Sequence, residues 1–196
     1  MTATATAPLT VIGIDAGPGT TTLRTADHVL HRLADVLPLP AGAFACTHRV
    51  RPPGERPGLA LSLAVPATVS EAILDGLGAV AGPAGLRFGT EAGAGAALAA
   101  AEHTGRDGGR AVYFPGGAEL PGRLTVGELL ATTAIDAAEV LGGTPADPDT
   151  VLITRSHVRP EWVAGRLLLR LMPALGGTYV PFETPDPHPC CGADHD

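Results

Sequence analysis

The first 89 residues alternate between short apolar runs and segments of helical periodicity, and this alternation restricts the folds open to the chain. Apolar, β-branched runs bounded by glycine and proline are typical of buried strands. Apolar residues that recur every three or four positions are typical of a helix that covers a sheet. Strands are expected at residues 9–15, 43–51, 59–65 and 86–89, and helices at residues 25–37 and 68–81. The order of elements is therefore β-α-β-β-α-β.

The remaining residues continue this pattern. An alanine-rich helix is expected at 92–102, strands at 110–114, 150–154 and 178–182, and helices at 125–141 and 160–172. The fold class is α/β or α+β, with a mixed sheet and flanking helices. Residues 9–89 suit a ferredoxin-like sandwich, with a three-layer arrangement as the alternative, and a further β/α half follows. One globular domain is expected at 9–183, with sub-halves at 9–90 and 108–183, a disordered tail at 1–8 and a Pro/Cys/His tail at 184–196.

The helix ends carry distinct local signals. Thr25 is a candidate N-cap for the first helix, because a threonine hydroxyl accepts a hydrogen bond from an otherwise unpaired backbone N–H. Residues 68–71 and 125–128 both have the spacing of a capping box. Pro160 suits the first position of a helix, where no backbone N–H is needed.

The composition excludes several classes of function. The net charge of −7 argues against a general nucleic-acid binder, because neutralising phosphates requires a basic face. The chain contains no Lys, Asn or Gln, a bias typical of a GC-rich bacterial genome, so lysine Schiff bases and the P-loop lysine are excluded. No long apolar run and no signal peptide is apparent, which predicts a cytoplasmic protein without a membrane partner.

The strongest chemical signal is a group of thiols and imidazoles in the tail. Its members are His188, Cys190, Cys191 and His195. Thiolate and imidazole are the ligands that Zn²⁺ and Cu(I) prefer, so a metal-binding protein is the leading hypothesis. The alternatives are a solvated tail with an incidental pair of thiols, and redox use of the adjacent thiols.

Cys46 and His48 offer further ligands outside the tail. They lie two residues apart on an expected strand, so both side chains point to one face. If the tail packs back over that strand, the combined groups would close a Cys/His site for Zn²⁺ or Cu(I).

A loop rich in glycine and threonine follows the first strand. Its candidate functional residues are Asp15, Gly17, Gly19, Thr20 and Thr21, with Asp15 in a catalytic role and the others binding a ligand. Glycines allow a close approach of the backbone, and hydroxyls with backbone N–H groups can hold an anion near a helix start. A plain turn is the alternative, because the loop matches neither the dinucleotide-binding nor the P-loop pattern.

Residues 154–160 form a second candidate anion site. Arg155, His157 and Arg159 would share one face if the preceding strand continues, next to the N-terminus of the helix expected at Pro160. Ser156 adds a hydroxyl, and His157 is the candidate catalytic acid or base because imidazole exchanges protons near neutral pH. The alternative is a solvated strand edge.

Three functions are consistent with these features. The first is binding of Zn²⁺ or Cu(I) through the tail together with Cys46 and His48. The second is a small enzyme or binding protein whose partner is an anionic metabolite. The third is a non-catalytic assembly protein that forms a homo-oligomer through its apolar helices, chiefly the one expected at 160–172.

Overall fold

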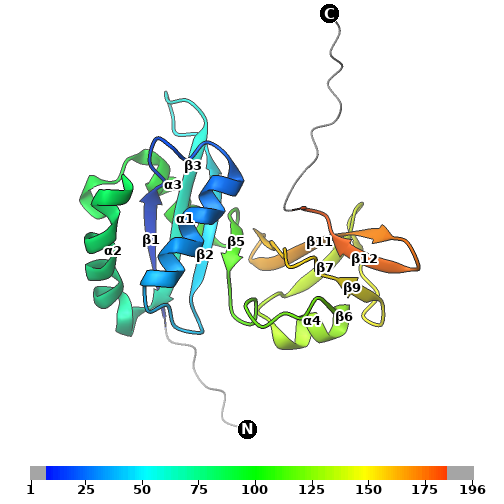
Figure 1. Ribbon diagram of the computed structural model, residues 1–196. Helices are drawn as coiled ribbons and strands as arrows, with labels where there is room; N and C mark the ends of the chain where they lie inside the picture. Colours follow the sequence, from blue (N-terminus) through cyan, green and yellow to red (C-terminus); the bar gives the residue numbers. More distant parts are fainter. Residues whose placement is uncertain (1–7, 185–196) are drawn as a thin grey trace, which may run out of the picture.

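The computed structural model describes residues 8–184, which form two lobes that share one sheet (Figure 1). The first lobe consists of β1 (Leu9–Asp15), α1 (Leu23–Val36), β2 (Phe44–Val50), β3 (Gly58–Pro66), α2 (Ser70–Ala84), β4 (Arg87–Phe88) and α3 (Ala94–Gly105), with short 3₁₀ turns at Ala67–Val69 and Gly89–Glu91. Among the described residues there are four α-helices and a mixed sheet of 12 strands, so the expected fold class, a mixed sheet with flanking helices, is confirmed.

The second lobe is built mainly from short strands. Its elements are β5 (Arg110–Tyr113), β6 (Arg123–Thr125), α4 (Val126–Thr132), β7 (Ala137–Val140), β8 (Thr144–Pro145), β9 (Val151–Ile153), β10 (Glu161–Val163), β11 (Arg166–Ala174) and β12 (Thr178–Pro181). No described helix is long and apolar enough to cross a bilayer.

The sheet runs without interruption from one lobe to the other. In the first lobe the strand order is β4-β1-β3-β2, and every neighbouring pair is antiparallel. The β-α-β-β-α-β order expected along the chain is observed, while the ferredoxin-like interpretation of it stays a prediction. β5 pairs with both β2 and β10, and the path continues as β10-β11-β12-β9-β6, with β7 paired to β11 and β8. The lobes are therefore joined by backbone hydrogen bonds through β5.

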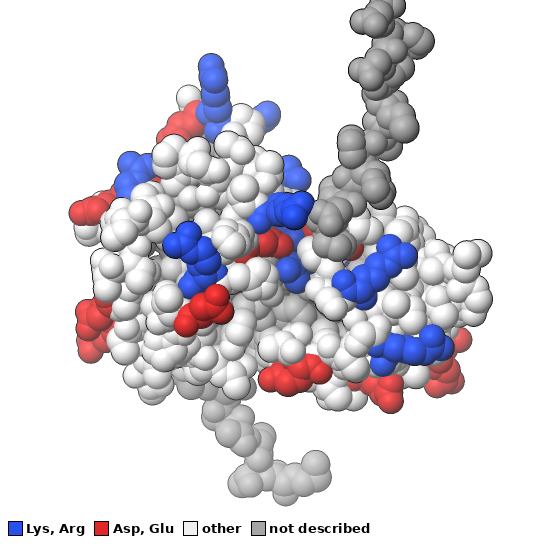
Figure 2. Space-filling view, viewed as in Figure 1, with Lys and Arg blue, Asp and Glu red and all other residues white. Residues whose placement is uncertain are grey.

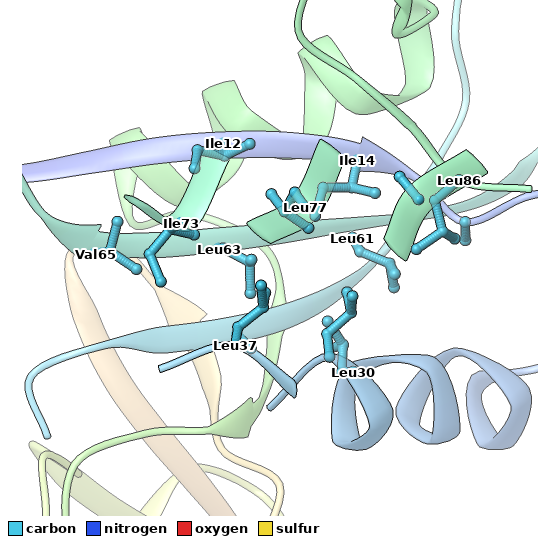
Figure 3. Close-up of a cluster of buried hydrophobic side chains, with 14 of the residues drawn as sticks. Ile12, Ile14, Leu30, Leu37, Leu61, Leu63, Val65, Ile73, Leu77 and Leu86 are labelled. Carbon is cyan, nitrogen blue, oxygen red and sulfur yellow. The ribbon is translucent and has the colours of Figure 1, made fainter. Parts of the chain in front are cut away.

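The hydrophobic core of the first lobe lies between its sheet and helices α1 and α2 (Figure 3). Ile14, Leu61 and Leu63 point to this face because alternate side chains of a strand share a face. Leu30 from α1 and Leu77 from α2 pack against them. Burial of each such side chain stabilises the fold by about 1.5–3 kcal/mol.

Helix α3 covers the opposite face of the same sheet. Gly13 of β1 lies beneath it, and a Cβ at this position would be only 2.1 Å from the carbonyl oxygen of Ala96. The helix is rich in alanine on this side, and Ala96 and Ala99 are buried. Small residues on both elements thus allow the helix to lie close to the strands, and the first lobe has helices on both faces of its sheet.

Two expected helix starts differ from the observed ones. The N-cap of α1 is Thr22 rather than Thr25, and Thr25 supplies the reciprocal side-chain bond of a capping box. The capping box expected at residues 68–71 does not form, because residues 67–69 make a 3₁₀ turn and α2 begins at Ser70. The box at residues 125–128 forms as expected and opens α4.

The prediction of a helix at 160–172 is wrong, because this segment forms a β-hairpin. Ala164 and Gly165 have φ angles of 47° and 84°, and Val163 pairs with Arg166, so a two-residue turn connects β10 to β11. Two successive residues with positive φ are the signature of a type I′ turn, whose twist suits a hairpin. Oligomerisation through an apolar helix at this place is therefore excluded.

The helix expected to run to residue 141 ends at Thr132 instead. Residues 137–140 form β7, which pairs in parallel with β11. One edge of β7 is paired with a strand that lies about 30 residues later in the chain, and the other edge is paired with β8. The helical periodicity of this segment is local, and pairing with β11 overrides it.

Candidate functional site

A Cys/His group lies between the sheet and helix α3. Cys46 and His48 project from β2 onto the same face, as expected from their spacing, and His103 reaches them from the last turn of α3. One potential ligand atom from each residue lies within 4.8 Å of the other two. The described residues therefore contain a group that could hold a metal ion, although its third member, His103, was not expected from the sequence.

Hydrogen bonds connect this group into one chain. Ser62, the residue of β3 opposite Cys46, has its Oγ 2.8 Å from Nε2 of His48 and 2.6 Å from Nδ1 of His103. Nδ1 of His48 lies 2.8 Å from a carboxylate oxygen of Glu102. The carboxylate can only accept, so Nδ1 of His48 carries its proton and Nε2 accepts from the Ser62 hydroxyl. Nδ1 of His103 must then donate to Ser62.

The group is buried, and burial controls its protonation. The exposed fractions of Cys46, His48 and His103 are 0%, 1% and 4%. Burial raises the pKa of the Cys46 thiol to about 12. Burial lowers the pKa of His48 despite the opposing carboxylate of Glu102, and it lowers the pKa of His103 to about 4. At neutral pH the thiol is protonated and both imidazoles are neutral, which is the form of histidine that binds metals.

Trp162 of β10 closes the group on the side of the second lobe. Its ring centroid lies 6.3 Å from that of His103 and 5.6 Å from that of Phe44. The buried indole Nε1 has no hydrogen-bond acceptor of good geometry among the described residues. Its N–H is nevertheless close enough to Cys46 to favour the thiolate, as does the hydroxyl of Ser62. The thiol sulfur thus faces groups that would stabilise a negative charge.

A groove of about 1510 Å³ runs between the two lobes and borders this group. Figure 2 shows charged side chains of both signs in the hollow between the lobes. Glu102, Gly108, Gly109 and Trp162 line the groove and also surround the Cys/His group, so they form a shared wall. We call this feature the interlobe groove.

An ionic network occupies the floor of the interlobe groove. Arg110 of β5 donates two hydrogen bonds to Asp27 of α1, at 2.5 and 2.9 Å, and two to Glu183, which follows β12. Arg159 also donates to Asp27, at 3.0 Å, and Nε2 of His157 lies 3.0 Å from Glu183. Burial disfavours the charge on Arg110, but the hydrogen bonds that it donates to Asp27 and Glu183 outweigh this effect and raise the pKa of Arg110.

The expected metal ligands are distributed as follows. Cys46 and His48 lie together, and His103, Ser62 and Glu102 complete their surroundings. The four tail residues His188, Cys190, Cys191 and His195 lie outside the described residues. His103 was not singled out from the sequence, although its place in a helix whose alanines are typical of close packing could have marked it as buried.

The residues of the glycine-rich loop have mainly structural contacts. A carboxylate oxygen of Asp15 accepts a hydrogen bond of 2.7 Å from the backbone N–H of Gly93, just before α3. A Cβ at Gly17 would lie 2.8 Å from the carbonyl oxygen of Gly85, so the loop packs against the end of α2. Gly19 and Thr20 line the interlobe groove, whereas Thr21 is exposed outside its lining.

The second candidate anion site is divided by the fold. Arg155 and Ser156 lie exposed in a turn with φ angles of 54° and 52°, while His157 and Arg159 face the interlobe groove. The helix dipole expected at Pro160 is absent, because β10 follows. Anion binding by the groove-facing pair remains a prediction.

No family model matches the sequence, and searches of curated proteins and of solved structures also returned no match.

Proposed function

We propose that this protein binds one thiophilic metal ion, Zn²⁺ or Cu(I), through Cys46, His48 and His103. The observation that carries the proposal is the approach of their three ligand atoms to within 4.8 Å of one another in a buried site. Donor atoms around one zinc ion lie roughly 3.3–3.8 Å apart, given bond lengths of about 2.0–2.3 Å. Small side-chain rotations would therefore bring the three groups into coordination.

The Ser62 hydroxyl lies between the two imidazoles, where it bonds to both. Metal binding would exchange these two hydrogen bonds for two coordination bonds. Three protein ligands leave one position of a tetrahedral zinc ion open, and the Ser62 oxygen is the nearest group to fill it. Cu(I), which binds well to sulfur and imidazole, needs no fourth ligand.

Glu102 supports the proposal because of its contact with His48. Histidines that bind metals commonly donate their second ring N–H to a carboxylate, which fixes the ring orientation and strengthens the ligand. Nδ1 of His48 and the carboxylate of Glu102 are 2.8 Å apart, which leaves Nε2 directed toward Ser62. Glu102 is accordingly a positioning residue for the metal.

Competition between the full-length protein and a chromophoric chelator tests the proposal. One equivalent of Zn²⁺ should bind, and Cys46→Ser should weaken the affinity at least 100-fold, because a hydroxyl is a poor substitute for thiolate. Glu102→Gln should weaken it about 10- to 100-fold. Co²⁺ bound to the wild type should show the charge-transfer absorption of a cobalt–thiolate bond, and Cys46→Ser should not.

The matched control is the double variant Cys190→Ser/Cys191→Ser, which should bind Zn²⁺ as the wild type does. Full binding by Cys46→Ser together with loss in the double variant would contradict the proposal and assign the metal to the tail. Proton release gives an independent measure. Between pH 7 and 8 only the Cys46 thiol has a proton to lose, so the logarithm of the affinity should rise by about one per pH unit.

A further inference from the structure

We propose that Arg110, with His157 and Arg159 beside it, forms a binding site for a carboxylate group, and that Glu183 fills this site as an internal ligand. The site lies on the floor of the interlobe groove. It uses none of the three proposed metal ligands, so the two proposals stand or fall separately. The expected ligand is a small molecule that presents a carboxylate to the groove.

Residues other than Glu183 also hold Arg110 in place. Arg110 is only 6% exposed, and one edge of its guanidinium donates hydrogen bonds to both carboxylate oxygens of Asp27. Thr47 of β2 accepts a further hydrogen bond at 3.1 Å. The opposite edge, formed by Nε and one terminal nitrogen, is directed at Glu183. A rigid pair of parallel N–H donors is the geometry that recognises a carboxylate.

Glu183 is held much less firmly than Asp27. Asp27 is buried within helix α1, whereas the side chain of Glu183 is 34% exposed and follows the last strand, β12. The last backbone contact before Glu183 is the hydrogen bond from the N–H of Phe182 to the carbonyl of Arg170, so the chain is anchored one residue earlier. Small movements of residues 182–184 would release the carboxylate and leave the Arg110 guanidinium in place.

The charges at this point also require one negative group. Arg110 and Arg159 contribute two positive charges, and Asp27 contributes one negative charge to both of them. Without Glu183, one positive charge and the N–H groups of the Arg110 edge would remain unpaired at the groove floor. Burial opposes the charge on Glu183, yet the hydrogen bonds from His157 and Arg110 outweigh it and lower its pKa to about 2. The site therefore strongly favours a monoanion.

The test uses Glu183→Gln in the full-length protein, with sodium acetate as the probe and sodium chloride keeping the ionic strength constant. The amide retains the size of the side chain but removes the competing charge. Acetate should bind this variant saturably and at least 10-fold more tightly than the wild type, as followed by NMR shifts of the arginine side chains. Adding His157→Gln to the variant should weaken acetate binding again.

The matched control is Glu161→Gln, which removes a groove carboxylate that lies opposite Arg110 in the pairing of β10 with β5 but forms its ion pair with Arg170. Its acetate affinity should equal that of the wild type. Absence of saturable binding in Glu183→Gln, or equal gains in both variants, would overturn the proposal. Inorganic phosphate binding as tightly as acetate would overturn the assignment to carboxylates. Cys46→Ser should change none of these results, which separates this site from the metal.

Discussion

Gly109 packs its backbone directly against the imidazole of His48. A Cβ at this position would lie 2.5 Å from Cε1 of His48, and the φ angle of 92° belongs to a region that side chains rarely adopt. A single glycine thus serves both as part of the groove wall and as the support that keeps a candidate metal ligand in position.

Gly109→Ala should destabilise the protein by about 3 kcal/mol, because the new methyl group must displace His48 as well as strain the backbone. Zn²⁺ affinity should fall with it. Gly142→Ala is the matched control, since Gly142 has a φ of 100° but no neighbour within 4 Å. It should cost only about 1 kcal/mol. If urea unfolding gave the same loss of unfolding free energy for both variants, the contact with His48 would not contribute to stability.

Local patterns revealed only part of the Cys/His group. Cys46 and His48 were found because strand alternation is a property of neighbouring residues. Ser62 is 14 residues from His48, and Glu102 is 54 residues from it, so their contacts depend on which strands pair and where α3 packs. The groove network is further removed, because Arg110 meets Asp27 across 83 residues. Such contacts follow from the whole fold.

Among the elements, helix α3 depends most clearly on one small residue. Its backbone lies over Gly13 of β1, and the carbonyl of Ala96 occupies the place of a side chain there. The helix also carries Glu102 and His103, so its distance from the sheet controls how Glu102 meets His48 of β2 and how His103 meets Ser62 of β3.

Gly13→Ala should lift α3 from the sheet and destabilise the protein by about 2–3 kcal/mol, because backbone atoms rather than a flexible side chain stand in the way. Gly19→Ala, at a position without neighbours within 4 Å, should change stability by less than about 0.5 kcal/mol. Thermal unfolding of both variants measures the difference. Similar midpoints would contradict the close packing of α3.

Short strands were predictable where turn residues bounded them, as at Leu9–Asp15 and Thr178–Pro181. The prediction of a helix over Glu161–Ala174 was wrong, because Pro160 followed by apolar residues is compatible with a helix start as well as with a strand. In the sequence, Gly165 was the one sign of a turn here, because glycine readily adopts the positive φ angle that the turn requires. The positive φ angle of Ala164 is unusual for alanine. Residues 137–140 were predicted as helix for another reason, because they form a strand only through pairing with β11 and β8.

On the scale of the whole molecule, the lobes share a hydrophobic cluster that includes Cys46 and Trp162, and two sets of polar contacts also join them. One is the pairing of β5 with β2 and β10, and the other is the ionic network in which Asp27 of the first lobe contacts Arg110 and Arg159. Because Asp27 satisfies two guanidinium groups at once, it is the most sensitive point of the network.

Asp27→Ala should destabilise the protein by about 3–5 kcal/mol, because Arg110 would be left as a buried charge with fewer partners. Asp35→Ala, on the exposed side of the same helix, should change stability by less than about 0.5 kcal/mol. Urea unfolding of the two variants provides the comparison. A small effect of Asp27→Ala would mean that strand pairing and apolar packing hold the lobes without the ionic network.

Trp162 is the only tryptophan of the chain, and it stands between the Cys/His group and the interlobe groove. Indole fluorescence responds to the polarity and charge of its immediate surroundings. Its ring contacts His103 and Phe44 on one side, while the guanidinium of Arg106 lies 5.0 Å from its centroid. The protein therefore carries an intrinsic optical reporter at the boundary of both candidate sites, and its emission can follow occupancy without any label.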